Sequence, residues 1–473
     1  TAPQARTPAH SAAPVRRAGR RRRVGSRSGA SGASAHPMDP SDTQPLQRVL
    51  VDKSNAEPVR PPGFIKLGAP LPIRIPARPE EITMEWLTDA FRFKGYLMRD
   101  GRVVSLNMQA IGEGQGAFGD LVLVTVTFEG GRLNAPTTFV AKFAPACTGR
   151  LKRLETRVIF LNEAHFYNDF TIQDGACARP ECYLAACEPR RSEPTFCFLL
   201  ENMLPATTWS RTEGCSSLPH LQMVMRMLAR FHARWWGHRK APPVEWPMHP
   251  SDYGGIFRQL FISMHRKGLP ALARCFGPWY APVLEWIPRL RGRYALLYQL
   301  MVTPHTLSLV HGDAHLDNIF FSERYPNGCA LIDFALVAFG PAVRDVCFFL
   351  GTNVEPEVRR AHEHVLLRTY HAELLEGGVS SYPWEQCWRD YRLQLWWPLV
   401  QLLTLTPTWA KQKKVRAGMW AERPTEADAK LKQMYDRYHP RLVAALTDHG
   451  WDQLFSEHCD TRCGVCSCLP CCA

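Results

Sequence analysis

The chain has 473 residues, of which 45% are hydrophobic and 11% are aromatic. This length and apolar content are enough for a large buried core with two or three domains or lobes, and they exclude a mainly disordered protein. The longest apolar runs, over 294–310 and 393–405, are interrupted by Gln, Pro or His before they reach the roughly 20 residues of a membrane span. We therefore expect no transmembrane helix.

The formal net charge of +13 is concentrated near the N-terminus. Eight arginines and no acidic residue lie between Thr1 and Met38, so the rest of the chain carries a net charge of only +5. A basic segment with few large apolar residues cannot offset its chain entropy by burial, and we expect it to be disordered. Arg-rich, Ser-rich segments without acidic residues are also typical of organelle transit peptides. We expect a cytoplasmic protein, with an organelle as the alternative, and no specific nucleic-acid partner.

Sixteen cysteines are distributed unevenly. Ten are scattered through the body without paired spacing, which indicates a reduced protein, and six lie between Cys459 and Cys472. Two Cys-x-x-Cys pairs in this terminal group could ligate zinc, but the single residue between them leaves no room for a small fold around the metal. We therefore favour a disordered thiol-rich tail over 456–473.

The pattern of secondary structure changes along the chain. A Pro-rich linker leads to an amphipathic helix that begins after the N-cap residue Thr83. Three β-branched runs follow, which predict an antiparallel meander. A helix with Glu163 and a short apolar strand come next, and beyond Leu218 the pattern becomes largely helical. The three β-branched runs are 103–111, 121–128 and 137–143, the short strand is 196–200, and the clearest later helices are 220–236, 358–376 and 384–405.

This order predicts an α+β fold with a small, β-rich N-terminal lobe and a larger helical C-terminal lobe. A nucleotide cleft between the lobes would be natural. The expected boundaries are a leader and linker at 1–77, an N-lobe at 78–203, a C-lobe at 204–455 and the Cys-rich tail at 456–473.

The strongest motif places three oxygen-bearing side chains at strand ends. An apolar strand leads into His311-Gly312-Asp313, Asn318 follows in the same loop, and a second strand ends at Asp333. Phosphoryl transfer needs a carboxylate that accepts a proton from the attacking hydroxyl, and hard oxygen ligands for Mg²⁺ on the ATP phosphates. Asp313 fits the catalytic base, and Asn318 and Asp333 fit the metal ligands. The alternative is that Asp313 and Asn318 only form turns.

A glycine pattern upstream supports a nucleotide site. Gly114, Gly116 and Gly119 form a GxGxxG, which is a weak signal by itself. In a dinucleotide-binding fold the third glycine opens a helix, whereas here Asp120 leads into a strand pattern. A Gly-rich hairpin over phosphates is therefore the better interpretation.

Lys142 is a single charged residue within an apolar strand pattern. A buried ammonium is costly without a partner, and ATP phosphates together with Glu163 would supply one. The alternative is an edge-strand lysine whose head reaches solvent.

These motifs give the chain a recognisable likeness. It resembles the aminoglycoside phosphotransferase and choline-kinase-like superfamily, and most closely its ecdysteroid-kinase-like branch. The likeness extends roughly from Ile82 to Tyr438 and rests on these ordered matches: Gly112-Glu-Gly114, the Lys142 strand, Asn162-Glu163, Leu200-Glu201-Asn202, Leu228-Ala-Arg-Phe-His232, His311-Gly-Asp313 with Asn318, Ile332-Asp333-Phe334 and Gly340-Pro-Ala-Val-Arg-Asp345.

The resemblance implies a two-lobed, protein-kinase-like fold and a role for each matching residue. Asp313 would be the base, Asn318 and Asp333 would bind Mg²⁺, and Lys142, paired with Glu163, would bind the α and β phosphates. Main-chain atoms around Glu201 to Met203 would receive the adenine. His311 would brace the catalytic loop, and Asp345 would hold it through main-chain hydrogen bonds.

The resulting prediction is a small-molecule kinase that uses ATP and Mg²⁺ to phosphorylate a hydroxyl. Alternatives are a nucleotide-binding pseudokinase and an aminoglycoside-type phosphotransferase; a protein kinase is disfavoured because no long activation segment follows Asp333. Inside the loop, His315 and Asp317 could touch substrate or structure the loop, and we favour the second. The many tryptophans of the helical lobe could cage a cation or a flat alcohol, but we favour core packing. The substrate and the oligomeric state are not predicted.

Overall fold

The computed structural model describes residues 73–111, 120–144, 150–169, 177–188, 195–237, 255–302, 306–403 and 425–465. The basic leader, the Pro-rich linker up to residue 72 and the end of the thiol-rich tail lie outside these ranges. Within them, none of the helices combines the length and apolar character that a bilayer crossing requires.

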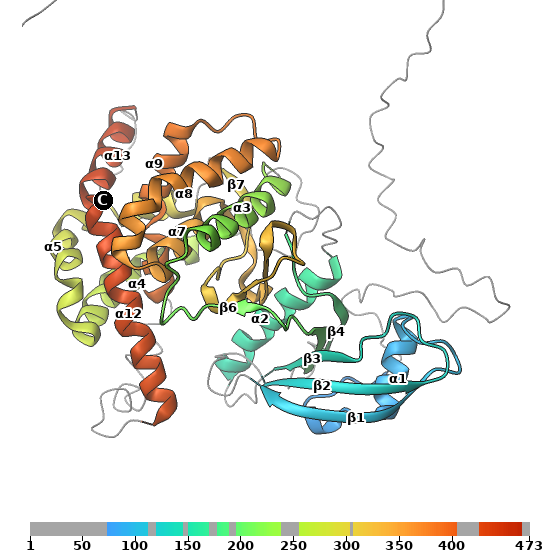
Figure 1. Cartoon of the computed structure of the whole chain (residues 1–473). Helices are drawn as coiled ribbons and strands as arrows, with labels where there is room; N and C mark the ends of the chain where they lie inside the picture. The colour runs from blue at the N-terminus through green and yellow to red at the C-terminus, as the bar shows by residue number, and fades with distance from the viewer. Residues whose placement is uncertain are drawn as a thin grey trace, which may run out of the picture. The chain divides into compact units, whose positions relative to one another are not determined.

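The N-terminal lobe is a five-stranded antiparallel sheet with strand order β1-β2-β3-β5-β4 (Figure 1). The meander β1-β2-β3 confirms the prediction from the three β-branched runs. β4 was not predicted, because its sequence, Cys-Tyr-Leu-Ala-Ala-Cys-Glu, has few β-branched residues. The strands are β1 (Arg102–Ile111), β2 (Asp120–Glu129), β3 (Thr138–Phe143), β4 (Cys182–Glu188) and β5 (Thr195–Glu201).

The sheet separates two apolar clusters, one on each face. α1 (Met84–Phe93) begins at Thr83, whose Oγ1 accepts a hydrogen bond from the Trp86 amide at 3.1 Å, and it covers one face through residues such as Phe91. α2 (Arg150–Asp169) covers the other face, where Phe160 packs on Phe198. Alternate residues of β5 contribute to the two clusters, which explains why this strand is a continuous apolar run.

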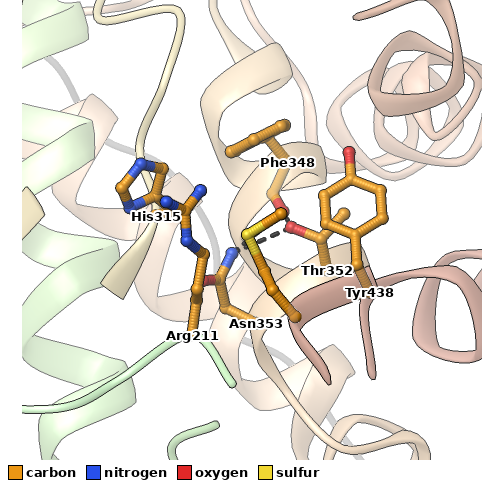
Figure 2. Close-up of a pocket in the computed structure, with 7 residues that line it drawn as sticks. Arg211, His315, Phe348, Thr352, Asn353 and Tyr438 are labelled. Carbon is orange, nitrogen blue, oxygen red and sulfur yellow. Dashed lines mark hydrogen bonds between the residues drawn. The ribbon is translucent and has the colours of Figure 1, made fainter. Parts of the chain in front are cut away.

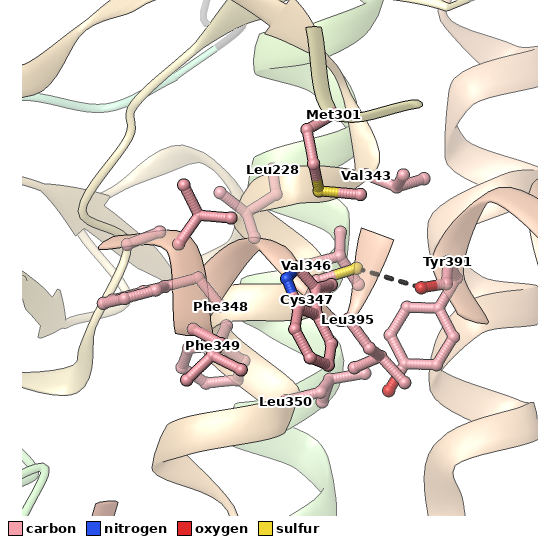
Figure 3. Close-up of a cluster of buried hydrophobic side chains, with 14 of the residues drawn as sticks. Leu228, Met301, Val343, Val346, Cys347, Phe348, Phe349, Leu350, Tyr391 and Leu395 are labelled. Carbon is pink, nitrogen blue, oxygen red and sulfur yellow. Dashed lines mark hydrogen bonds between the residues drawn. The ribbon is translucent and has the colours of Figure 1, made fainter. Parts of the chain in front are cut away.

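The C-terminal lobe is mainly helical, as predicted. Its central helix is α7 (Val343–Asn353), and every residue of α7 is buried (Figure 3). A helix that is enclosed on all sides is a rigid platform for whatever its first turn carries. The other helices are α3 (Leu218–Arg234), α4 (Gly255–Phe276), α5 (Ala281–Leu290), α6 (Tyr294–Val302), α8 (Pro356–Glu376), α9 (Trp384–Gln394), α12 (Glu426–Asp448) and α13 (Trp451–Val465).

Two small antiparallel sheets lie in this lobe and carry the loops of the predicted motif. β7 pairs with β10, and β8 lies between β6 and β9. The strands are β6 (Thr207–Thr208), β7 (Leu307–Val310), β8 (Ile319–Phe321), β9 (Cys329–Leu331) and β10 (Ala338–Pro341). Together with the N-terminal sheet, they confirm the α+β, two-lobed, protein-kinase-like fold.

Two expectations about helices are corrected. The helix expected over 384–405 is interrupted, because α9 ends at Gln394 and residues 397–403 form a separate helical segment. Pro398 has no amide hydrogen to continue the helical bonds, which accounts for the break. The tail expected to be disordered from residue 456 is helical up to Val465, and Cys459 is buried in the core. Residues 466–473 lie outside the described ranges. They include all of one Cys-x-x-Cys pair and the second cysteine of the other.

The tryptophans were expected to serve core packing, and Trp396 does so. Its ring is fully buried, stacks on Trp451 with centroids 4.1 Å apart, and donates its indole hydrogen to His265. These contacts explain the apolar character of the sequence around Trp396.

Candidate active site

The loop that carries Asp313 begins at the end of β7. Its main chain turns at Gly312, where φ is +83°, a conformation that favours glycine. A Cβ at this position would lie 2.3 Å from the carbonyl oxygen of Leu336. Only glycine therefore allows the segment after β9 to pass this close to the loop.

Asp345, in the first turn of α7, holds this loop from beneath. Its Oδ2 accepts a hydrogen bond from the His311 amide at 2.6 Å, and its Oδ1 accepts one from the Gly312 amide at 2.9 Å. His232 Nε2 lies 3.1 Å from the same carboxylate. Burial opposes ionisation, but the bond from His232 and the main-chain donors outweigh it and hold the pKa of Asp345 below its ordinary value. The loop thus rests on a buried, ionised carboxylate.

His311 is fully buried and links the two segments of the motif. Its Nε2 donates to the carbonyl oxygen of Ile332 at 2.9 Å, and its Nδ1 accepts from the Asp313 amide at 3.2 Å. Ile332 directly precedes Asp333 in the chain. These contacts give His311 a positioning role between Asp313 and Asp333 and leave it no open side toward a substrate.

The Asp313 side chain is 30% exposed, so it is open to a ligand. Its Oδ2 lies 3.4 Å from His315 Nε2. Burial raises the pKa of Asp313, but nearby positive charge, including that of the Arg211 guanidinium, outweighs this effect and brings the pKa below its ordinary value. The carboxylate is therefore ionised at neutral pH and can accept a proton.

Asn318 lies in the short 3-10 helix η5 (Leu316–Asn318) and closes the loop. Its Nδ2 donates to the Asp313 carbonyl oxygen at 3.0 Å and lies 3.2 Å from His315 Nε2. The main-chain carbonyl oxygen of Asn318 accepts a hydrogen bond from the Ile332 amide at 3.0 Å. The amide nitrogen of the side chain is thus used within the loop.

Lys142, Glu163 and Asp333 form a charged cluster contributed by β3, α2 and the segment after β9. Lys142 Nζ lies 2.7 Å from Glu163 Oε2 and 3.2 Å from Asp333 Oδ1. Burial would lower the pKa of Lys142, but the two carboxylates outweigh it and raise that pKa, whereas burial raises the pKa of Glu163. A single lysine thus faces two carboxylates, and the alternative of a solvent-facing Lys142 is wrong.

Asp333 has an unusual backbone conformation. Its φ is +63°, in the left-handed region that residues other than glycine rarely adopt. Such strain is concentrated at functional sites, where the surrounding structure imposes it. Its side chain is 33% exposed, so one carboxylate faces both Lys142 and open space.

Five other residues were predicted to contact the nucleotide, and the structure describes two of them. Gly114, Gly116 and Gly119 lie outside the described residues, in the connection from β1 to β2. The strand after them is present, because Ile111 pairs with Leu121 in an antiparallel ladder.

Glu201 and Met203 lie where the chain leaves β5. Glu201 Oε2 accepts from the Glu181 amide at 3.0 Å, and the Met203 carbonyl oxygen accepts from Arg324 Nη2 at 2.5 Å. The Tyr325 hydroxyl lies 3.4 Å from the same oxygen. The Met203 carbonyl is therefore already paired within the protein.

Arg211 was not identified from the sequence, although it lies beside the catalytic loop. Its amide donates to Asp317 Oδ1 at 2.9 Å, and its Nε lies 2.6 Å from Asp317 Oδ2. Arg441 donates in turn to the Arg211 and Thr212 carbonyl oxygens. Asp317 thus makes contacts that structure the loop. No local signal links Arg211 to Asp317, because 106 residues separate them.

A small cavity lies behind the loop, with His315 and Arg211 on one side and Thr352 and Tyr438 on the other (Figure 2). It has room for about one water molecule. Its lining residues are Arg211, His315, Phe348, Thr352, Asn353, Met434 and Tyr438.

The donor set around the loop fits a hard cation that binds together with phosphate oxygens. Asn318 and Asp333 supply uncharged and charged oxygen atoms, and Mg²⁺ characteristically uses one or two protein carboxylates plus substrate phosphates. Across the described ranges, no group of three or more His, Cys, Asp or Glu side chains could hold a metal ion by itself.

Comparison with protein families decides the relationship. The model of the ecdysteroid kinase-like family matches residues 113–378, which is more than half of the chain. The chain belongs to the ecdysteroid kinase-like family. This confirms the resemblance drawn from the motifs around Lys142, Asp313 and Asp333. No curated protein matches the sequence.

Several solved structures of small-molecule kinases are similar to this chain, although their sequence identity to it is low. An ethanolamine kinase from Plasmodium vivax is 12% identical and covers 75% of this chain and 83% of its own, with a TM-score of 0.38. A choline kinase from Streptococcus pneumoniae is 15% identical, covers 73% and 94%, and has a TM-score of 0.39. Aminoglycoside 2'-phosphotransferase-IIIa in its GDP complex is 13% identical, covers 71% and 93%, and has a TM-score of 0.40.

Proposed function

We propose that the protein transfers the γ-phosphoryl group of ATP to a hydroxyl of a small molecule. The observation that carries the proposal is the meeting of Lys142, Glu163 and Asp333 beside a loop that presents an ionised, partly exposed Asp313. His311 joins these two parts, because it bonds both the Asp313 amide and the residue before Asp333.

On the nucleotide side, Lys142 would bind the α and β phosphates while Glu163 holds its ammonium group. The exposed part of Asp333 and the Asn318 amide oxygen would hold Mg²⁺, which when bound neutralises the charge on the phosphates. The glycines 114, 116 and 119 would cover the phosphates. Because the Met203 carbonyl is already paired with Arg324, the adenine would use other main-chain atoms between Glu201 and Met203.

On the acceptor side, Asp313 would orient the substrate hydroxyl and take its proton. The oxygen then forms a bond to the γ-phosphorus, and the bond from that phosphorus to the β-phosphate oxygen breaks. The products are ADP and a phosphate monoester, and Asp313 then releases the proton to solvent.

The pseudokinase alternative would retain nucleotide binding without transfer. It does not explain why an ionised and partly open Asp313 lies on a loop whose main chain is held by Asp345 and His311. An aminoglycoside-type activity remains an outcome of the test below.

The proposal is tested with the purified full chain, Mg²⁺ and ATP, and a pooled library of sterols, amino alcohols, sugars and aminoglycosides, with phosphorylated products detected by mass spectrometry. We expect a product whose formation falls roughly 10²- to 10⁴-fold in Asp313→Asn, the range for loss of a general base. Asp89→Asn, an exposed aspartate on α1, is the matched control and should retain full activity.

The product would also identify the substrate class. Full activity in Asp313→Asn would contradict the assignment of the base. Binding of Mg²⁺ and ATP without any product across the library would favour the pseudokinase alternative.

A further inference from the structure

His315 lies in the catalytic loop and presents its two ring nitrogens to different surroundings. Nε2 faces the loop, where it is 3.2 Å from Asn318 Nδ2 and 3.4 Å from Asp313 Oδ2. Nδ1 is buried and has no hydrogen-bond partner among the described residues. The whole residue is only 6% exposed, and it lines the small cavity behind the loop (Figure 2).

We propose that His315 is a positioning residue that sets the orientation of the Asn318 side-chain amide, with a water molecule in the cavity accepting its Nδ1 hydrogen. This inference rests on the proposed function, because it concerns how Asn318 presents an oxygen atom to Mg²⁺. It assigns to His315 a role in the loop that does not require contact with substrate.

The orientation of the Asn318 amide follows from its neighbours. An amide NH₂ group has two hydrogens, and two acceptors lie within reach, the Asp313 carbonyl oxygen at 3.0 Å and His315 Nε2 at 3.2 Å. The flipped amide would place its oxygen against the Asp313 carbonyl oxygen, and two acceptors would then face each other. The unflipped amide directs its oxygen away from these two groups.

This arrangement decides which nitrogen of His315 carries hydrogen. Nε2 has one lone-pair position, so it cannot accept from Asn318 and also donate to Asp313. If Nε2 accepts, the neutral ring carries its hydrogen on Nδ1, which faces the cavity. A buried donor without a partner is destabilising, and a water in a polar cavity removes that cost.

The cavity is suited to hold such a water. Polar side chains from two elements line it, including Arg211, Thr352 and Asn353. Asn353 Oδ1 also accepts from the Leu316 amide at 3.0 Å, so the wall of the cavity is attached to the loop itself. The cavity therefore lies where it can support the ring of His315 from behind.

The first test reads the ring directly and needs neither metal nor nucleotide. We would record ¹⁵N NMR spectra of the full chain with ¹⁵N-labelled histidine at mildly alkaline pH, and assign His315 by its loss in His315→Gln. We expect the tautomer with hydrogen on Nδ1. A hydrogen on Nε2 would overturn the inference, whatever the activity of the protein.

The second test uses two substitutions of His315, each of which keeps a polar atom near only one of the two ring-nitrogen positions. Glutamine can place an amide oxygen near the Nε2 position and still accept from Asn318, whereas asparagine reaches only the Nδ1 position. We would measure Mn²⁺ binding by electron paramagnetic resonance in the presence of a non-hydrolysable ATP analogue. We expect His315→Asn to weaken Mn²⁺ binding roughly 10- to 100-fold, the usual effect of losing a group that orients a metal ligand, and His315→Gln to change it much less.

The control is His364→Gln, which replaces a histidine on α8 that contacts Trp384 and should leave Mn²⁺ binding unchanged. Thermal melting of each variant separates weakened binding from unfolding. Equal Mn²⁺ affinities for the wild type and a folded His315→Asn would overturn the inference alone. Absence of any Mn²⁺-nucleotide binding by the wild type would instead overturn the proposed function, and with it the role of His315 toward the metal.

Discussion

Lys142, Glu163 and Asp333 meet through their charged ends, whereas Asp313 lies on a loop that is held mainly by hydrogen bonds to its main chain. The nucleotide half of the site therefore depends on a balance of charges between three elements of the two lobes. The acceptor half depends on a buried support beneath a single loop. The first half can be disrupted by changing a charge, and the second by changing a hydrogen-bond acceptor.

This difference also determines what a substitution costs. In the charged cluster, loss of the lysine leaves two carboxylates facing each other, one of them 1% exposed. Beneath the loop, loss of an acceptor leaves main-chain donors unsatisfied without any large change in charge at the nucleotide side. The two halves should therefore respond differently in stability and in nucleotide binding.

The largest effect is expected for Lys142→Met. Removing one partner of a buried ion pair costs about 3–5 kcal/mol, and the phosphates lose their ammonium contact. We expect a lower melting temperature and a large loss of Mg²⁺-ATP affinity, measured by thermal melting and by isothermal titration calorimetry. Lys267→Met, at an exposed position on α4, is the matched control.

A double variant sharpens this prediction. Lys142→Met combined with Glu163→Gln removes the uncompensated buried charge, so it should recover much of the stability but none of the nucleotide affinity. Recovery of both properties would show that Lys142 does not contact the nucleotide.

A smaller effect is expected for Asp345→Asn beneath the loop. An asparagine can accept with only one atom where the carboxylate uses two, so the free energy of unfolding should fall by about 1–3 kcal/mol. The phosphoryl-transfer rate should fall while Mg²⁺-ATP affinity stays close to that of the wild type, measured by steady-state kinetics and calorimetry. A loss confined to nucleotide affinity would contradict the separation of the two halves.

The same variant has a pH signature. The pKa of Asp345 in the folded protein is below its ordinary value of 3.8, so its ionised form adds stability above that pH, and this stability is lost as the pH falls below it. Denaturant unfolding between mildly acidic and strongly acidic pH should therefore show a smaller loss of stability for Asp345→Asn than for the wild type.

Much of the nucleotide half could be predicted from the sequence. A lone lysine in an apolar strand requires a partner, and Glu163 was the candidate that the next helix offered. Likewise, the β-branched runs predicted the meander, and the oxygen-bearing residues at strand ends predicted the site. Each of these inferences depends on local pattern or on the energetic cost of burial.

The acceptor half could be predicted only in part. Arg211 and Asp317 are brought together by tertiary packing, and neither has a sequence neighbour that signals the other. The surroundings of His315 depend on Asn353 and Tyr438, which come from two different helices. β4 was missed because its sequence has little local strand propensity, and its place in the sheet depends on pairing with β5.

The most direct test of the central claim measures Mg²⁺-ATP affinity and phosphoryl transfer side by side for the wild type, Asp313→Asn and Asp333→Asn. The account predicts that Asp313→Asn binds Mg²⁺-ATP as the wild type does but forms product orders of magnitude more slowly, whereas Asp333→Asn loses Mg²⁺-dependent nucleotide binding itself. The same loss of both properties in the two variants would contradict the division of the site into a nucleotide half and an acceptor half.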